Sequence, residues 1–226
     1  MLSYSLVKKR GLTPQKPLRR ADPQDPESVK RCRTQEFPKI RRLAKKQKAS
    51  ISFADEAGIR SDFHAGTTSA PRGQTPVVPS TGQRFGVNLI SAISPRGELR
   101  FTVTKGSVNA SVFVDFLKRL LQGEDHPIFL IVDGHPSHRS RKTLEFVKST
   151  QGRLRLFFLP AYSPELNPDE LVWNHVKTHG LGRRIIRARD ELKSMAIGHL
   201  RSPQKMPHRV RAFFREAHVR YAADAC

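Results

Sequence analysis

The sequence has few cysteines and no long apolar runs, and each shortage excludes a class of protein. The two cysteines of this 226-residue chain, Cys32 and Cys226, are too few for a disulfide framework or a cysteine-ligated zinc site. No apolar run approaches the roughly 18 residues that a membrane span needs. The amino terminus also lacks the apolar h-region of a secretory signal. We therefore expect a cytoplasmic protein with reduced cysteines.

Acidic residues are also scarce, because 20 Asp and Glu stand against 41 Lys and Arg, for a net charge of +21. The excess lies on the flanks: residues 1–50 carry 15 basic and 4 acidic side chains, and residues 178–226 carry 11 and 4. A nearly neutral centre between basic ends is typical of a protein whose ends bind nucleic-acid phosphates, with an affinity that falls as salt rises. The alternative is a charged surface without a polyanionic partner.

The central part of the chain alternates between strand and helix patterns. Apolar residues spaced three and four apart predict a helix capped by Asn109, and further helices are expected over 138–150 and from Asn167 or Pro168 onwards. A hairpin followed by alternating helices and strands implies an α/β fold, a mixed five-stranded sheet with helices on its faces. Short apolar runs predict its strands at 50–55, 84–94, 98–106, 127–133 and 154–160.

Composition divides the chain into three parts. Residues 1–49 form a basic, proline-rich segment with a helix that we expect to be interrupted near Pro38, and this segment looks more like an arm than part of a core. Residues 50–180 form the α/β domain. Residues 181–226 form a basic and mostly helical extension.

Three carboxylates occupy special positions in this arrangement. Asp55 ends the first predicted strand, Asp133 ends the fourth, and Glu170 lies in the first turn of the helix after the fifth. The ends of adjacent strands form the crevice where α/β sheets bind ligands, so the three acids can converge there. Hard oxygen ligands favour Mg²⁺ or Mn²⁺, and two such ions can promote attack on a phosphodiester. The pattern therefore predicts phosphoryl transfer on nucleic acid.

The two aspartates also have structural explanations, since Asp55 suits a strand-end turn and Asp133 precedes a glycine. His135 and His138 follow Asp133 closely, and the three residues together could hold a transition metal. Neutral histidine is a poor Mg²⁺ ligand, however, and no third histidine lies at ligand spacing. We therefore favour the hypothesis that His138 orients Asp133 or contacts a phosphate.

Glu170 has the strongest structural alternative. With Asn167 as N-cap and Pro168 as the first helical residue, Glu170 would complete a capping box. Its neighbour Asp169 points about 100° away around the helix, so only one of the two acids can face a metal.

Three sequence blocks, "FADEAG", "LIVDGHPSHRS" and "FFLPAYSPELNPDELVWNHVK", occur in this order between Ile51 and Lys177. Together they resemble the signature blocks of the DDE endonuclease domain of bacterial insertion-sequence transposases of the mariner-like superfamily. The resemblance places the catalytic and metal-binding triad on Asp55, Asp133 and Glu170, with 36 residues between the last two. The resemblance favours Glu170 over Asp169 as the third acid of the triad.

This resemblance implies an RNase H-like fold and a site for Mg²⁺ or Mn²⁺, with two ions expected. It also implies DNA strand cleavage followed by strand transfer, with transposon ends and target DNA as partners. Such transposases usually act as dimers, so a homodimer is the arrangement to test. A bacterial, nucleoid-associated location is expected.

The chain departs from the family pattern at two places. Ser69 stands where a tryptophan is common, which puts the packing or DNA contact of that loop in doubt. We also expect most of the amino-terminal helix-turn-helix region to be missing, with "SYSLVKKRGLTPQKP" as its remnant.

Two alternative functions stay open at this point. The chain could be an RNase H-like nuclease or resolvase without strand transfer, or a catalytically idle DNA-binding remnant of a truncated element. In each case, basic side chains would contact the DNA backbone. The candidates for this contact are Lys45, Lys46, Lys48, Arg72, Arg139, Lys177, Arg183 and Arg184.

Overall fold

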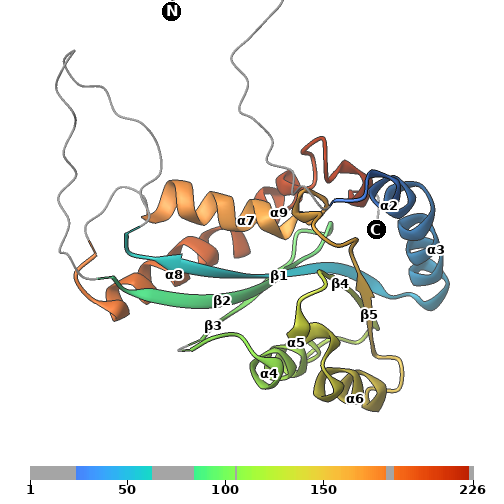
Figure 1. The fold of residues 1–226 in the computed structure, drawn as a ribbon, viewed down its shortest axis with the longest axis horizontal. Coiled ribbons are helices and arrows are strands. Elements are labelled where there is room, and N and C mark those ends of the chain that lie inside the picture. Colours follow the sequence, from blue (N-terminus) through green and yellow to red (C-terminus); the bar gives the residue numbers. More distant parts are fainter. Residues whose placement is uncertain (1–23, 63–83, 105, 182–185, 224–226) are drawn as a thin grey trace, which may run out of the picture.

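The computed structural model of this protein describes residues 24–62, 84–104, 106–181 and 186–223, with the backbone alone for 179–181. These residues form one mixed five-stranded sheet with helices on both faces, as the sequence predicted (Figure 1). The strands are β1 (Ser50–Arg60), β2 (Gly86–Ile93), β3 (Leu99–Thr104), β4 (Ile128–Val132) and β5 (Leu154–Phe158).

The sheet has the order β3-β2-β1-β4-β5. Strands β1, β2 and β3 form an antiparallel meander, whereas β4 pairs parallel with β1, and β5 pairs parallel with β4. The chain leaves β1 towards β2 on one side and leaves β4 towards β5 on the other. A ligand site is therefore expected beyond the carboxyl end of β4, beside the part of β1 that runs on past it.

Each face of the sheet has its own apolar core. Residues at odd positions of β1, such as Ile51 and Phe53, belong to one core, and Ala54 belongs to the other, because strand side chains alternate between faces. The face of Phe53 is covered by α3 (Phe37–Gln47), α7 (Asp169–His175), α8 (Arg189–Gln204) and α9 (Pro207–Phe213). The opposite face carries α4 (Ala110–Leu120), α5 (Pro136–Arg139) and α6 (Arg141–Ser149).

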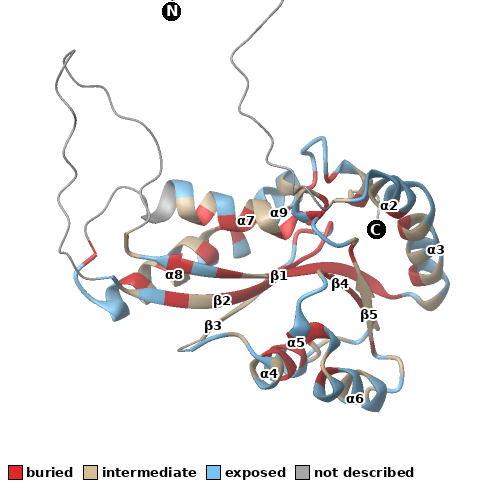
Figure 2. Ribbon diagram, viewed as in Figure 1, coloured by how far each residue is buried: buried red, intermediate tan, exposed pale blue. Residues whose placement is uncertain are grey.

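Strand β1 is longer than the sequence indicated. The prediction that it ends at Asp55 is wrong, because it continues to Arg60. The extension pairs with β2 throughout, from Phe53 opposite Ile93 to Arg60 opposite Gly86. Figure 2 shows buried residues along most of β1, with β2 and β4 beside it. The sequence did not predict this continuation, because the polar residues at 55 and 56 break the apolar run of the strand.

The helix near Pro38 is not interrupted. Helix α2 (Pro26–Arg31) passes through a π-helical segment, η1 (Cys32–Glu36), directly into α3. Pro38 lies at the start of α3, next to this wider turn, where its missing N–H removes little hydrogen bonding. Phe37 is buried, and its ring lies against those of Phe53 and Tyr221. Residues 26–47 therefore pack against the sheet rather than forming a free arm.

Two further segments differ in detail from the predictions. The helix predicted over 138–150 is two helices, because Ser140 has an extended backbone and its side chain caps α6 by accepting from the Thr143 N–H at 3.2 Å. The carboxyl-terminal helices are part of the core, since Leu192, Leu200 and Phe214 are buried. Within the described ranges, no helix is long and apolar enough to cross a membrane.

Candidate active site

Two of the three predicted acids lie at equivalent positions of adjacent strands. Parallel pairing between β1 and β4 ends with Phe53 opposite Ile131. Asp55 and Asp133 each lie two residues beyond this last pair, Asp55 within β1 and Asp133 just after the end of β4. The extra length of β1 does not disturb this relation, because the pairing with β4 has already ended at Asp55.

The third acid reaches the same place from helix α7. Asn167 fixes the start of this helix: its side-chain amide donates to the Ala54 carbonyl at 3.1 Å, and its Oδ1 accepts from the Asp169 N–H at 3.1 Å. The Asn167 N–H itself donates to the Pro164 carbonyl at 2.9 Å. A capping box would need that N–H to be free for the Glu170 side chain, so the capping explanation of Glu170 is not supported.

Asp169 and Glu170 have separate environments, as the helical geometry predicted. Asp169 is fully buried, and one of its oxygens accepts from the Ser91 hydroxyl at 2.7 Å. Ser91 lies opposite Asp55 in the β1–β2 pairing, so Asp169 lies beneath the site. Burial raises the pKa of Asp169 well above its ordinary value, although the Ser91 hydrogen bond acts against this shift. Glu170 is only partly buried and faces the cleft.

Asp55, Asp133 and Glu170 line one cleft of about 390 Å³, which lies where β4 has ended and β1 runs on past it. The segment after β5 supplies the rest of its wall, from Leu159 to Pro164, together with Gly134 and Asn167. The sequence therefore located three acids that the fold brings to one hollow.

The acids of this cleft repel one another. Burial raises the pKa of Asp55 well above its ordinary value, and the neighbouring carboxylates of Glu170 and Asp169 raise it further. Burial also raises the pKa of Glu170, while Lys177 and a hydrogen bond from Asp55 oppose this shift. A bound cation would relieve both effects, because it stabilises the charged form of each acid.

The residues of the cleft fit a hard divalent cation. Asp55 is buried, and its Oδ2 has no hydrogen-bond partner among the described residues. A buried carboxylate oxygen without a partner is costly unless a ligand satisfies it. The three acids offer only oxygen ligands, which Mg²⁺ and Mn²⁺ prefer.

Asp133 is held from two sides. Its Oδ1 accepts from the His135 backbone N–H at 2.9 Å and contacts Nδ1 of His138 at 2.9 Å. Burial raises the pKa of Asp133, but these contacts outweigh it and hold the pKa below its usual range. The carboxylate therefore stays charged and keeps one orientation.

Glu56 is a residue of this region that the sequence reasoning missed. Its Oε1 lies 2.7 Å from Nε2 of the buried His138, so the imidazole connects Glu56 to Asp133. Burial lowers the pKa of His138, but the two carboxylates outweigh this and raise it to about 9. The sequence did contain a signal for Glu56. It directly follows Asp55, and because neighbouring strand residues face opposite sides of a sheet, two adjacent acids place a carboxylate on each face of the strand.

The predicted DNA-binding residues are only partly brought to the cleft. Lys177 interacts with Glu170, and Arg139 is exposed with its guanidinium 4.2 Å from the Phe158 ring centre. Arg139 lines a smaller hollow that shares Leu159, Pro160 and Ala161 with the main cleft.

The other predicted DNA-binding residues lie elsewhere. Lys45, Lys46 and Lys48 are exposed before the start of β1, more than about 15 Å from Asp55 along the strand. The structure does not bring them to the cleft, because α3 enters β1 at the opposite end. Arg72, Arg183 and Arg184 lie outside the described residues, as does Ser69.

Solved structures of the Mos1 mariner transposase share this fold. A paired-end complex with Mn is 16% identical in sequence, with a TM-score of 0.63, over 96% of this chain and 69% of the other. A Mos1 strand transfer complex is 18% identical, with a TM-score of 0.56, over 93% and 68% of the two chains. The Mos1 catalytic domain bound to raltegravir and Mn is 16% identical, with a TM-score of 0.56, over 89% and 98%. No curated protein matches the chain.

The sheet order and the helices on its two faces define an RNase H-like domain of the type found in transposases. A family model described as DDE superfamily endonuclease matches residues 50–193. The chain therefore belongs to the DDE superfamily of endonucleases, and this membership implies a metal-dependent nuclease. The matched region extends beyond residue 180 into α8, whose Leu192 is buried against the core.

Proposed function

We propose that this protein is the catalytic part of a transposase that cuts a DNA strand and joins the freed 3′ end to target DNA. The observation that carries the proposal is the convergence of Asp55, Asp133 and Glu170 on one cleft, where a buried oxygen of Asp55 has no hydrogen-bond partner among the described residues. Membership of the DDE superfamily and the likeness to Mos1 complexes with DNA ends support it.

Asp55, Asp133 and Glu170 would hold a divalent cation, for which we expect two Mg²⁺ or Mn²⁺ ions. When bound, the metal would activate the attacking water or hydroxyl and stabilise the leaving oxygen of the phosphodiester. Asp55 supplies the buried oxygen, and Asp133 supplies a carboxylate that is charged at neutral pH. Glu170, which lies in α7, supplies the third carboxylate.

His138 is a positioning residue in this proposal. Its Nδ1 contact with Asp133 fixes one rotamer of the carboxylate, and its Nε2 contact with Glu56 fixes the ring. Phe113 packs against the imidazole with ring centres 4.3 Å apart, which limits its movement further. Each contact reduces the reorganisation needed when a cation arrives.

Basic side chains at the rim would hold the DNA backbone. Arg139 and Lys177 are the best placed of the candidates in the described residues, since they lie next to the cleft or its acids. Phosphate contacts of this kind position DNA without reading its sequence. A homodimer and a location on the bacterial nucleoid remain predictions.

A nuclease without strand transfer is the second candidate, because the same triad would serve both reactions. The two are separated by incubating the full chain and Mg²⁺ with a plasmid and a DNA duplex that carries a pre-cut 3′ hydroxyl end. The duplex is taken from the sequence that flanks the coding region. A transposase should covalently join the duplex to the plasmid, whereas a plain nuclease should only nick it.

A matched duplex ending in a 3′ dideoxynucleotide is the control. It lacks the attacking hydroxyl, so it should give no joined product while nicking of the plasmid continues. Joining at equal levels with both duplexes would contradict strand transfer, and so would nicking without any joining.

A further inference from the structure

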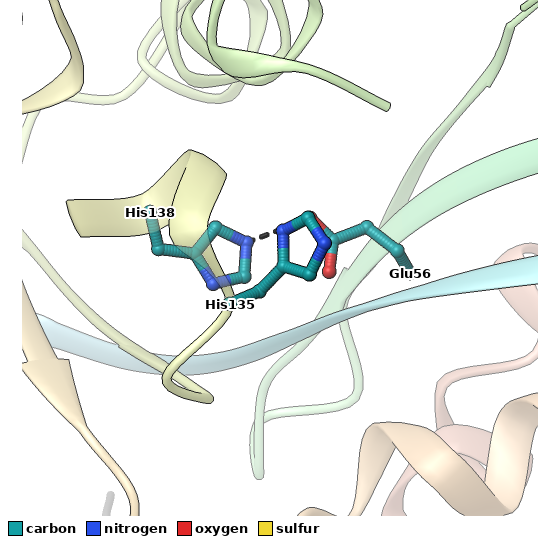
Figure 3. Close-up of side chains that lie close together, drawn as sticks. All are labelled: Glu56, His135 and His138. Atoms are coloured by element: carbon teal, nitrogen blue, oxygen red, sulfur yellow. Dashed lines mark hydrogen bonds and ion pairs between the residues drawn. The ribbon is translucent and has the colours of Figure 1, made fainter. Parts of the chain in front are cut away.

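A second group of metal-ligand side chains lies on the opposite face of β1 from Asp55. Glu56 lies in β1, His138 lies in α5, and His135 is the N-cap residue of α5. Figure 3 shows the two imidazoles and the carboxylate gathered together. One potential ligand atom from each of the three lies within 4.8 Å of the other two.

His138 is oriented as a metal-bound histidine usually is. Nδ1 of this buried ring contacts the Asp133 carboxylate at 2.9 Å, and Nε2 points at Glu56. Histidines that bind metals commonly donate their other ring N–H to a carboxylate, which fixes the tautomer and raises the basicity of the ligand nitrogen. With Nδ1 donating to Asp133, Nε2 faces the centre of the cluster, and a metal that binds there displaces the Nε2 proton.

His135 is fixed by its own cap contacts. Its Nδ1 accepts from the Ser137 N–H at 3.3 Å and lies 2.7 Å from the Ser137 hydroxyl, so we assign Nε2 as its ligand atom. His135 is exposed, whereas the side chain of Glu56 is 15% exposed and that of His138 is 1% exposed. The cluster is therefore open to solvent on the side of His135 and enclosed on the other.

We propose that Glu56, His135 and His138 form a second metal site, distinct from the triad, that binds Zn²⁺ or a similar transition-metal ion. Two imidazoles and one carboxylate, with water as the fourth ligand, are a known tetrahedral donor set for zinc. Imidazole ligands favour Zn²⁺ over Mg²⁺, whereas the triad offers only carboxylate oxygens. The two sites therefore select different ions, and this inference goes beyond the proposed transposase function.

Two of the three ligand atoms, those of His138 and Glu56, need only a small adjustment to accept the ion, and the exposed His135 completes the set by moving towards them. Zn–N and Zn–O bonds of about 2.0 Å at a tetrahedral angle place two ligand atoms about 3.3 Å apart. Nε2 of His138 and the nearer oxygen of Glu56 are 2.7 Å apart, so the glutamate has to retreat by a few tenths of an ångström. The contact between His138 and Asp133 can remain as it is.

The test measures Zn²⁺ binding to the full metal-free chain by titration calorimetry, with Mg²⁺ in excess to occupy the triad. His135→Asn is the main variant, because asparagine is a good helix N-cap and can still accept from the Ser137 N–H. It removes the outer imidazole and leaves the backbone contact to Asp133 in place. His126→Asn, at an exposed histidine before the amino end of β4, is the matched control.

One Zn²⁺ per wild-type chain is expected, with affinity at least about 100-fold lower in His135→Asn, because even the loss of outer-shell partners costs about 10- to 100-fold. His126→Asn and Asp55→Asn should bind as wild type does. Co²⁺ is the second probe, and its tetrahedral absorption bands should appear with the wild type and be lost with His135→Asn.

Unchanged Zn²⁺ affinity in His135→Asn would overturn the proposal, as would the absence of Zn²⁺ binding to the wild type. Zn²⁺ binding is measured with Mg²⁺ in excess at the triad and again in Asp55→Asn, which lacks a triad ligand but keeps all three residues of the second site. Failure of the zinc site is therefore distinguishable from failure of the proposed function.

Discussion

Replacing Asp55 by asparagine should stabilise the metal-free protein while removing its response to Mg²⁺. Asp55 is 8% exposed, and its Oδ2 has no partner in the part of the chain that the structure describes. Carboxylates of Glu170 and Asp169 crowd it. Asparagine keeps the shape, removes the charge and can still donate a hydrogen bond to Glu170.

The magnitude follows from the cost of an unsatisfied buried polar group, which is about 1–3 kcal/mol. Part of this cost remains because an amide also needs partners, so we expect the free energy of unfolding to rise by about 1–2 kcal/mol. For a domain of this size, each kcal/mol moves Tm by about 2–4 °C. Asp55→Asn should therefore melt about 2–8 °C above wild type in EDTA.

The same side chain predicts a pH dependence. Because the pKa of Asp55 is raised in the folded state, the folded chain binds this proton more tightly than the unfolded chain does. Its ionisation therefore destabilises the fold, and the metal-free wild type should lose stability as pH rises from the ordinary aspartate value towards the raised pKa. Asp55→Asn should lose less stability over that range.

Differential scanning calorimetry with EDTA and with Mg²⁺ measures both effects. Mg²⁺ should raise the Tm of wild type, because a ligand that binds only the native state stabilises it, and should raise that of Asp55→Asn much less. Asp115→Asn is the control at a side chain that is 70% exposed, and its stability should stay within about 0.5 kcal/mol of wild type. A variant that melts below wild type in EDTA and gains as much from Mg²⁺ would refute the reasoning.

Two further predictions concern stability away from the triad. Although burial acts against it, the pKa of His138 is about 9, so its stabilising contribution is complete below pH 6.5 and is lost as pH rises through about 9. Glu56→Gln should reduce this loss in the free energy of unfolding, measured by urea unfolding between pH 6 and 10, by roughly 1–3 kcal/mol. An unchanged pH profile would contradict the contact between Glu56 and His138. Phe37→Ala should cost about 3–5 kcal/mol in the same assay at neutral pH. Leu144→Ala, at a half-exposed site, should cost less than about 0.5 kcal/mol, and equal effects of the two changes would show that α3 is not part of the core.

The sheet could be predicted because its strands carry distinct patterns. Residues 128–132 form an unbroken apolar run, as expected of a strand buried on both faces. The helix start at Asn109 could be predicted because asparagine is a strong N-cap. In the structure, its Oδ1 accepts from the Val112 N–H at 3.1 Å. Local chemistry decides these elements, so local sequence reveals them.

The second half of β1 and the helix through Pro38 could not be predicted, because distant residues decide them. Strand β1 continues past Asp55 only because β2 pairs with it, and that pairing involves residues more than twenty positions away. The helix continues past Pro38 through a π-helical turn that buries Phe37 against Phe53. Neither tertiary contact leaves a pattern in the local sequence.

The candidate site could be predicted in part from the sequence. Asp55, Asp133 and Glu170 were predicted from strand ends and sequence blocks, and they line one cleft. Glu56 was missed, because its partner His138 is 82 residues away and meets it only when β1 and β4 lie side by side. The contact between Asp169 and Ser91 was missed for the same reason.

The central claim is that Asp133 belongs to a metal-dependent nuclease site. Plasmid nicking in Mg²⁺ by wild type and by Asp133→Ala, with DNA binding measured at two salt concentrations, tests it most directly. We predict that wild type nicks the plasmid and Asp133→Ala does not, while both bind DNA with an affinity that falls as salt rises. Nicking by Asp133→Ala at the wild-type rate would contradict the claim.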